Sequence, residues 1–254
     1  MTYPGTVRLS PAHLTHLASL LTVHRKAIGC RWRRLSPGRQ ALLVLAHLRN
    51  GDTYARLAAG LGIGVATVFR YIGEGVDLLA AHAPTLTAAL WQLAWSDRPL
   101  AILDGTLIPI DRLGGDNNRL YYSGKHHKHG VNLQALINAA GDLLWLSGGL
   151  PGSVHDLKAA RAHGIIKATT MAEIQTLGDK GYQGAGGTIA TSFKGRNLTD
   201  WQRHVNSLIN RRRGPGERGF ATLKAWKIFT KVRCCPHRIG PMAQAVLALE
   251  HAQR

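Results

Sequence analysis

The chain has 254 residues, with 32 Lys and Arg against 14 Asp and Glu, and a formal charge of +18 at pH 7. This excess of positive charge indicates a polyanionic partner, DNA or RNA, because neutralising phosphates releases their condensed counterions. A protein that only coats nucleic acid fits the same charge. An anionic membrane surface is a weaker candidate, because no basic amphipathic helix with a clean apolar face stands out.

The three cysteines, Cys30, Cys234 and Cys235, argue against a disulfide framework and lack the spacing of a Cys-x-x-Cys metal site. No apolar run is long enough to span a bilayer, and the first four residues, MTYP, do not begin a signal peptide. We therefore expect reduced thiols in a soluble, cytoplasmic protein, associated with the nucleoid if the source is bacterial.

Residues 1–95 are predicted to form a helical domain, because apolar residues recur at three- and four-residue spacing without strand-like alternation. Ser36-Pro37 predicts the start of one helix, which Gly51 ends. Asp52-Thr53 predicts the cap of the next helix. The expected apolar stripe of the first of these helices consists of Ala41, Leu42, Leu45 and Leu48.

A glycine-rich turn at residues 60–64 leads to a third helix, expected from Val65 to about Ala81 with Val68 and Ile72 facing inward. Helix, short turn and helix is the layout of a helix-turn-helix, whose second helix enters the major groove. A helical hairpin without DNA contact is the alternative, and the charge of the chain favours DNA binding. The side chains then available for DNA are Thr67, Arg70 and Tyr71.

Residues 83–98 are predicted to form a connecting helix or linker, and a second domain is expected over residues 96–254. Strands are predicted at residues 100–110, 130–138 and 143–150, and Gly141-Asp142 is a hairpin signal between the last two. A helix, a short strand and more helix follow. This order predicts an α/β domain with a mixed sheet flanked by helices, and it disfavours a purely parallel sheet.

Three acidic residues stand out in this second region. Asp104 lies inside an apolar strand, where a carboxylate is costly unless it is paired or bound to a metal, and apolar residues resume at Leu107. Asp179 ends a strand between glycines, a pattern that an ordinary turn explains equally well. Glu217 opens a helix, where it complements the helix dipole even without a catalytic role.

Taken together, the three acids suit phosphoryl transfer, which uses two hard cations to activate the attacking oxygen and stabilise the leaving oxygen. Mg²⁺ takes oxygen ligands and keeps several waters, so that a few convergent carboxylates hold it. The sequence therefore predicts a catalytic and metal-binding site at Asp104, Asp179 and Glu217.

Asp156 competes with Asp179 for the second position of this site. Ser153, with Asp156 three residues later, is typical of a capping box before a helix. We therefore predict that Ser153, His155 and Asp156 cap this helix or support the metal ligands, and that Asp179 binds the metal.

Basic residues near the acids are predicted to contact DNA phosphates. If residues 125–129 form a strand, His127 shares a face with Lys125 and His129. No nearby acid or cysteine completes a tetrahedral zinc site, so phosphate contact is favoured over zinc. A solvated basic face is the alternative for the clusters around Glu217. The predicted contacts are Lys125, His126, Lys128, Arg211, Arg212, Arg213, Arg218 and Lys224.

Five motifs occur in order along residues 99–250: DGT at 104–106, YSGKH at 122–126, PGSVHD at 151–156, GDKGY at 178–182 and GERGFATLK at 216–224. Together they resemble the transposases of the IS5 family and their PIF/Harbinger relatives. The resemblance implies an RNase H-like fold with Asp104, Asp179 and Glu217 as the metal-binding triad. It also implies two Mg²⁺ ions, for which Mn²⁺ substitutes.

A transposase of this kind is expected to bind terminal inverted repeats through its helix-turn-helix and to catalyse cleavage and strand transfer of double-stranded DNA. Synapsis of two DNA ends implies a homodimer or higher oligomer. Two alternatives stay open: a non-catalytic DNA-binding regulator derived from a transposase, and an RNase H-like nuclease without strand transfer.

Overall fold

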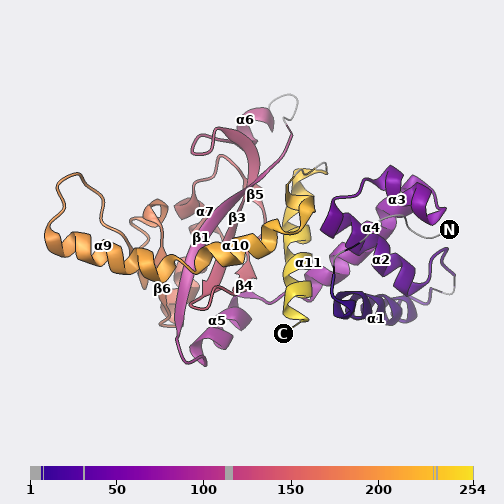
Figure 1. Ribbon diagram of the computed structural model, residues 1–254, viewed down its shortest axis with the longest axis horizontal. Helices are drawn as coiled ribbons and strands as arrows, with labels where there is room; N and C mark the ends of the chain where they lie inside the picture. The colour runs from indigo at the N-terminus through magenta and orange to yellow at the C-terminus, as the bar shows by residue number, and fades with distance from the viewer. Residues whose placement is uncertain are drawn as a thin grey trace. The chain divides into compact units, whose positions relative to one another are not determined.

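The computed structural model describes residues 7, 9–30, 32–111, 117–230, 232 and 234–253. The chain divides into two compact units (Figure 1). The helical unit comprises Met1–Ala83, Leu223–Val232 and Pro241–Arg254, and the sheet unit comprises Pro84–Thr222 and Arg233–Gly240.

This division differs from the predicted boundary at residue 95. Helix α5 (Leu86–Ala94) belongs to the sheet unit, because its residues Ala89, Leu90 and Leu93 are buried in the core of that unit. The chain also returns to the helical unit near its C-terminus. There the 3-10 helix η2 (Lys227–Phe229) packs against helix α2.

The helical unit contains α1 (Pro11–Ala27), α2 (Pro37–Asn50), α3 (Tyr54–Leu61) and α4 (Val65–Ala81). The predicted ends of α2 are confirmed: the Ser36 hydroxyl accepts from the Arg39 N–H, and Gly51 takes the left-handed conformation at φ +68°. The Thr53 hydroxyl caps α3 by accepting from the Arg56 N–H.

Helix α2 is the centre of the helical unit. Both α1 and α4 pack on it, so it is buried on more than one side. The predicted stripe is therefore too narrow: Leu43 and Val44 are fully buried, whereas Leu42 is only half-buried. Gly75 of α4 lies so close to α2 that an added Cβ would be 2.6 Å from Val44 Cγ2. A larger residue would clash there, which explains why this position is a glycine.

The strands of the sheet unit form one mixed sheet in the order β2-β3-β1-β6-β7, and β4 and β5 also pair with β3. Strand β1 is antiparallel to β3 and parallel to β6, and β6 is parallel to β7. The predicted mixed sheet is confirmed. The strands are β1 (Leu100–Pro109), β2 (Tyr122–Ser123), β3 (Lys128–Asn138), β4 (Leu143–Leu146), β5 (Leu150–Pro151), β6 (Gln175–Gly178) and β7 (Ile189–Thr191).

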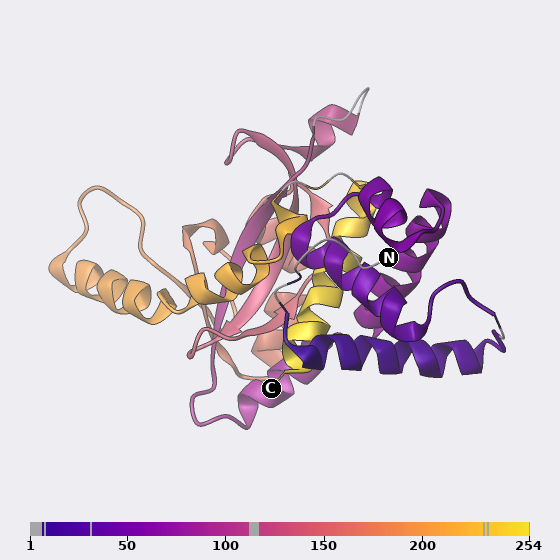
Figure 2. The same ribbon diagram turned by 45° about the vertical axis from the view of Figure 1, so that its right-hand side comes forward.

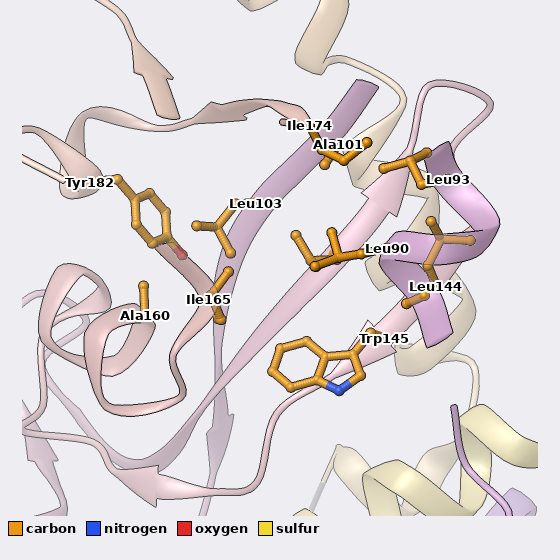
Figure 3. Close-up of a cluster of buried hydrophobic side chains, with 12 residues drawn as sticks. Leu90, Leu93, Ala101, Leu103, Leu144, Trp145, Ala160, Ile165, Ile174 and Tyr182 are labelled. Carbon is orange, nitrogen blue, oxygen red and sulfur yellow. The ribbon is translucent and has the colours of Figure 1, made fainter. Parts of the chain in front are cut away.

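One face of the sheet carries the apolar core (Figure 3). Ala101 and Leu103 of β1 pack there with residues of α5, α7 (Asp156–Ala162) and α8 (Ile165–Met171). The other face carries Ile102, opposite Ile137 of β3, and both contact glycines of α10 (Gly216–Lys224). Helices therefore cover both faces, as expected for an RNase H-like domain.

The remaining elements are short or lie outside the sheet. They are α6 (Asn117–Tyr121), η1 (Lys180–Tyr182), α9 (Asp200–Arg213), η3 (Pro236–Arg238) and α11 (Ile239–His251). All three cysteines are unpaired, as predicted, and burial raises the pKa of the Cys234 thiol to about 11.

No single helix in the described ranges has both the length and the apolar character needed to cross a membrane. The pair α3 and α4 passes that test only when taken together, and it is bent by 105° at the turn between them.

Candidate active site

Asp104 and Asp179 lie level with each other at two neighbouring parallel strands. Leu103 of β1 pairs with Gly178, the last residue of β6; Asp104 is the next residue of β1, and Asp179 directly follows the end of β6. Burial raises the pKa of Asp104; Arg213 and the Gly105 N–H oppose this rise, and the charges of Asp179 and Asp156 add to it. The pairing of β1 with β6 thus brings two residues far apart in the chain to one point of the sheet.

The glycines beside Asp179 permit close packing around its carboxylate. Asp179 accepts a hydrogen bond from the Gly181 N–H at 2.7 Å, as the N-cap of η1. A Cβ on Gly181 would lie 2.8 Å from Asp179 Oδ1 and 3.3 Å from Asp156 Oδ2. Asp179 therefore closes a turn, as the alternative interpretation held, and it also stands in a group of acids.

Asp156 is the third carboxylate of this group. Its oxygens accept hydrogen bonds from Lys125 Nζ at 2.7 Å, Asn132 Nδ2 at 3.0 Å and Gln134 Nε2 at 3.4 Å. Burial would raise the pKa of Asp156, but Lys125 and the two amides hold it below its usual value. The same ammonium lies 3.7 Å from Asp179 Oδ2, so Lys125 bridges two of the acids.

A buried chain of side chains holds Asp156 and its donors in place. The Tyr182 hydroxyl donates to Gln134 Oε1 at 2.6 Å, and Gln134 Nε2 donates to Asn132 Oδ1 at 2.8 Å. Tyr182, Gln134 and Asn132 are all buried, and a buried polar group is costly unless it is bonded. This network joins the apolar core to Lys125 at the surface. The sequence analysis missed Asn132 and Gln134, because no local sequence pattern distinguishes two amide side chains in a strand as partners of a distant acid.

The predicted capping box is wrong. Helix α7 begins at Asp156, its N-cap is His155, and no side chain caps it. Ser153 lies two residues before that N-cap, so Asp156 is the first residue of the helix and not the third, as a capping box would need; its carboxylate is bound by Lys125 and the strand amides instead. Ser153 and His155 instead line, with Asp156, Lys125 and residues of β2 and α6, a cavity of about 600 Å³.

Glu217 lies in the first turn of α10 and is exposed to solvent. A Cβ on the preceding Gly216 would lie 3.0 Å from Ile102, two residues before Asp104 on the same face of β1. The helix of Glu217 therefore covers the sheet face that carries Asp104. Within the described ranges, however, no three His, Cys, Asp or Glu side chains are already arranged to hold one metal ion.

The predicted phosphate-binding residues have different environments. Arg213 lies beside the acids, with Nη2 4.0 Å from Asp104 Oδ1. Arg218 packs its aliphatic stem against Gly141, in the β3–β4 turn. Three others are exposed: Arg211, Arg212 and Lys224.

The strand considered for residues 125–129 forms only from Lys128 onward, where β3 begins. Residues 124–127 form the turn between β2 and β3, and His127 has a φ of +52°, so side chains do not alternate there. The turn is what directs Lys125 toward Asp156. His126 lines the cavity, and Lys128 is exposed at the start of β3.

In the helical unit, the predicted contact of Tyr71 with DNA is also wrong. Tyr71 is buried, and its hydroxyl accepts a hydrogen bond from the Arg34 N–H at 3.1 Å. Arg70 is exposed and Thr67 is half-buried. Phe69 is exposed as well, which the inward direction of Val68 and Ile72 could have indicated.

The carboxylates of the sheet unit fit a hard divalent cation. Their oxygens are the ligands that Mg²⁺ and Mn²⁺ prefer. Burial, with smaller contributions from the charges of Asp179 and Asp156, raises the pKa of Asp104, and a bound cation would favour its ionised form.

Comparison with known families gives two matches. Residues 103–250 match the family model described as DDE superfamily endonuclease, and residues 33–85 match the helix-turn-helix of DDE superfamily endonuclease. A protein of Streptomyces albus G, described as the candidate transposase for insertion sequence element IS112, is 28% identical over 197 residues. That alignment covers 76% of this chain and 71% of the relative. No solved structure matches.

Proposed function

Because the chain belongs to the DDE superfamily endonucleases, we propose that it is the transposase of an insertion sequence of the IS5 and PIF/Harbinger type. In this proposal α3 and α4 recognise the terminal inverted repeats, with Arg70 and Thr67 facing the DNA. Asp104, Asp179 and Glu217 hold two Mg²⁺ ions, and Mn²⁺ substitutes for them.

One observation carries the proposal: Asp104 of β1 and Asp179 at the end of β6 stand level on adjacent parallel strands, and the helix that carries Glu217 in its first turn covers the face of Asp104. When bound there, divalent cations activate the attacking oxygen and stabilise the leaving oxygen of a phosphodiester. In the first displacement a water molecule attacks the phosphodiester, which leaves a 5′-phosphate and releases the 3′-OH of the DNA end. In the second, this hydroxyl attacks a phosphodiester of the target DNA, so that a new phosphodiester forms as the target bond breaks and a 3′-OH of the target leaves.

The side chains of the protein position the phosphodiester for these displacements. Arg213, beside Asp104, is placed to pair with a phosphate oxygen as DNA arrives. The ammonium group of Lys125 places a second positive charge beside Asp179, and its ion pair with Asp156 holds it there. Glu217 is exposed, and we expect its carboxylate to turn toward Asp104 when cations offset the repulsion between the acids.

Cutting and joining two ends of one element requires two active sites, so we expect a homodimer or higher oligomer in the synaptic complex. A DNA substrate also implies that the protein acts in the cytoplasm, on the nucleoid of a bacterial cell. The relative from Streptomyces albus G, described as a candidate transposase, supports this setting.

The test compares Asp104→Asn with the parent protein on DNA that carries the ends of the element, in Mg²⁺ and in chelator. We expect cleavage to fall by more than about 100-fold. Removing a residue that only supports a metal ligand already costs about 10- to 100-fold, and Asp104 is proposed to bind the metal itself. DNA affinity should stay nearly unchanged. Asp97→Asn, the same substitution at an exposed acid of the sheet unit, is the matched control.

Joining is measured separately with a pre-cut end that carries a 3′-OH. Cutting without joining would identify a nuclease, and binding without either would identify a regulator. Full cleavage by Asp104→Asn would reject the proposed site.

A further inference from the structure

Helix α9 and the loop that precedes it, residues 193–199, extend away from the strands of the sheet unit in both views (Figures 1 and 2). We call residues 193–213 the basic arm. Of the 14 residues of α9, only Ile209 is buried. A helix so little buried does not contribute much to the core, so its conformation calls for another explanation.

Specific contacts hold the basic arm in shape. Asn206 binds the backbone of Phe193 twice, accepting from its N–H at 2.7 Å and donating to its carbonyl at 3.1 Å. A reciprocal capping box joins Thr199 and Gln202 at the start of α9. The rings of Phe193 and Trp201 lie 5.5 Å apart. The loop is thus fastened along the helix, and the arm is a preformed surface.

The charge of the basic arm is strongly one-sided. Residues 194–213 contain six Lys and Arg and a single acid, Asp200, which pairs with Arg203. Four of these cations are exposed, and within the described part of the chain their side chains form no salt bridge or hydrogen bond: Lys194, Arg196, Arg211 and Arg212. Four cations held together on one projection, without anions of their own, match a polyanion.

Apolar surface accompanies these charges. Trp201 is 65% exposed and Leu208 is 41% exposed, seven residues apart and therefore on the same side of α9. Such residues on an exposed helix also suit a second copy of the chain. Two identical arms would, however, bring their unpaired cations together, and like charges across an interface are unfavourable. The charge therefore favours DNA.

The base of the arm lies at the candidate active site. Arg213, the last residue of α9, is the one that approaches Asp104, and Glu217 lies in the first turn of the next helix. With a rise of 1.5 Å per residue, α9 is about 21 Å long, roughly the length of six base pairs. DNA bound with a phosphate at Asp104 would continue along the arm.

We propose that the basic arm is a second DNA-binding surface, distinct from the helix-turn-helix, which holds about six base pairs of duplex beside the scissile phosphate. Lys194, Arg196, Arg211 and Arg212 contact backbone phosphates. Trp201 packs against the sugar edge of a groove. The inference rests on the proposed function, since it takes DNA as the substrate of the acidic site.

The test measures affinity for a duplex of about 30 base pairs against salt concentration, in chelator and in the Asp104→Asn background, so that cleavage plays no part. Each phosphate contact contributes about 0.9 to the slope of log affinity against log salt. Arg196→Gln with Arg212→Gln should lower the slope by nearly two. The matched control, Arg98→Gln with Lys167→Gln, removes the same charge from exposed positions of the sheet unit outside the arm and should leave the slope unchanged.

Trp201→Ala separates apolar contact from charge. It should weaken binding several-fold with the slope unchanged, because an apolar contact releases no counterions. Analytical ultracentrifugation of Trp201→Glu measures the mass of the protein in solution and tests whether a second copy of the chain binds the arm instead of DNA. An unchanged slope in the arm variant would overturn the proposal, and a simultaneous drop in the mass of Trp201→Glu would assign the arm to a second copy. These binding data are independent of cleavage, so a failed arm does not reject the acidic site, and an inactive acidic site does not reject the arm.

Discussion

The two units bury polar side chains for different purposes. In the helical unit, Gln40 and His47 donate to or pair with backbone carbonyls of the same unit, Gln40 with Tyr71 and His47 with Asp52. Gln40 is also bonded to the side chains of Arg25 and Glu74, so these contacts tie helices and turns of the unit together. In the sheet unit, Gln134 and Asn132 lead instead to Asp156 and, through it, to an exposed ammonium. Buried polarity stabilises the fold in the first unit and orients surface charge in the second.

This contrast predicts where substitutions act. A buried polar residue of the helical unit should affect stability, and recognition there should depend on exposed side chains. A buried polar residue of the sheet unit should affect the chemistry of the candidate site. Three experiments, taken from the largest expected effect to the smallest, test the contrast.

The largest effect is expected for Asp156→Asn. Without this carboxylate Lys125 loses its anchor beside Asp179, and cleavage should fall by about 10- to 100-fold, the usual loss for a residue that orients a metal ligand. DNA affinity should change little. Cleavage assays in Mg²⁺ measure this, with Asp97→Asn as the control. An unchanged cleavage rate would remove Asp156 from the working site and leave it a structural role.

A smaller effect is expected for neighbouring residues of α4. Arg70→Ala should weaken DNA binding about 3- to 10-fold, because an exposed Arg contacts phosphates or bases. Tyr71→Phe should leave binding unchanged and lower the free energy of unfolding by about 1 kcal/mol, because it removes the hydroxyl that accepts from Arg34. Titration of the DNA and urea unfolding measure the two. Reversed results would mean that α4 presents another face to DNA.

The smallest effect concerns acid pH. Burial lowers the pKa of His47 from its ordinary 6.5. As the pH falls below 6.5, the unfolded chain therefore protonates this imidazole while the folded protein still keeps it neutral. Its contribution to stability is therefore complete above pH 6.5 and is lost as the pH falls below that value. The loss is at most about 1.4 kcal/mol per pH unit for one proton.

Urea unfolding at pH 7.5 and 5.5 measures this dependence, and His47→Gln should flatten it. His13 and His163 are shifted in the same direction by burial, so the variant should reduce the dependence without abolishing it. A dependence of equal size in His47→Gln would assign the effect to the other two histidines.

Much of the helical unit was predictable because helix ends depend on near neighbours. Ser36, Gly51 and Thr53 cap helices through hydrogen bonds that span a few residues, so their types already indicate their roles. The same holds for the burial of Tyr71, which lies three residues after Val68 on the buried face of α4 and which the helical period therefore indicates. Its partner, the Arg34 N–H, is 37 residues away in the chain, and local periodicity does not reveal it.

The sequence by itself determined the acids at which chemistry is expected, the mixed order of strands and the helices before them, because residue type and period act locally. Only the tertiary structure decided that Asp104 and Asp179 stand level, that Lys125 lies between Asp156 and Asp179, and that Asp156 caps nothing. These facts depend on strand register and on a turn at His127, which arise when distant segments pack. Packing selects partners over the whole chain, and no local pattern encodes that choice.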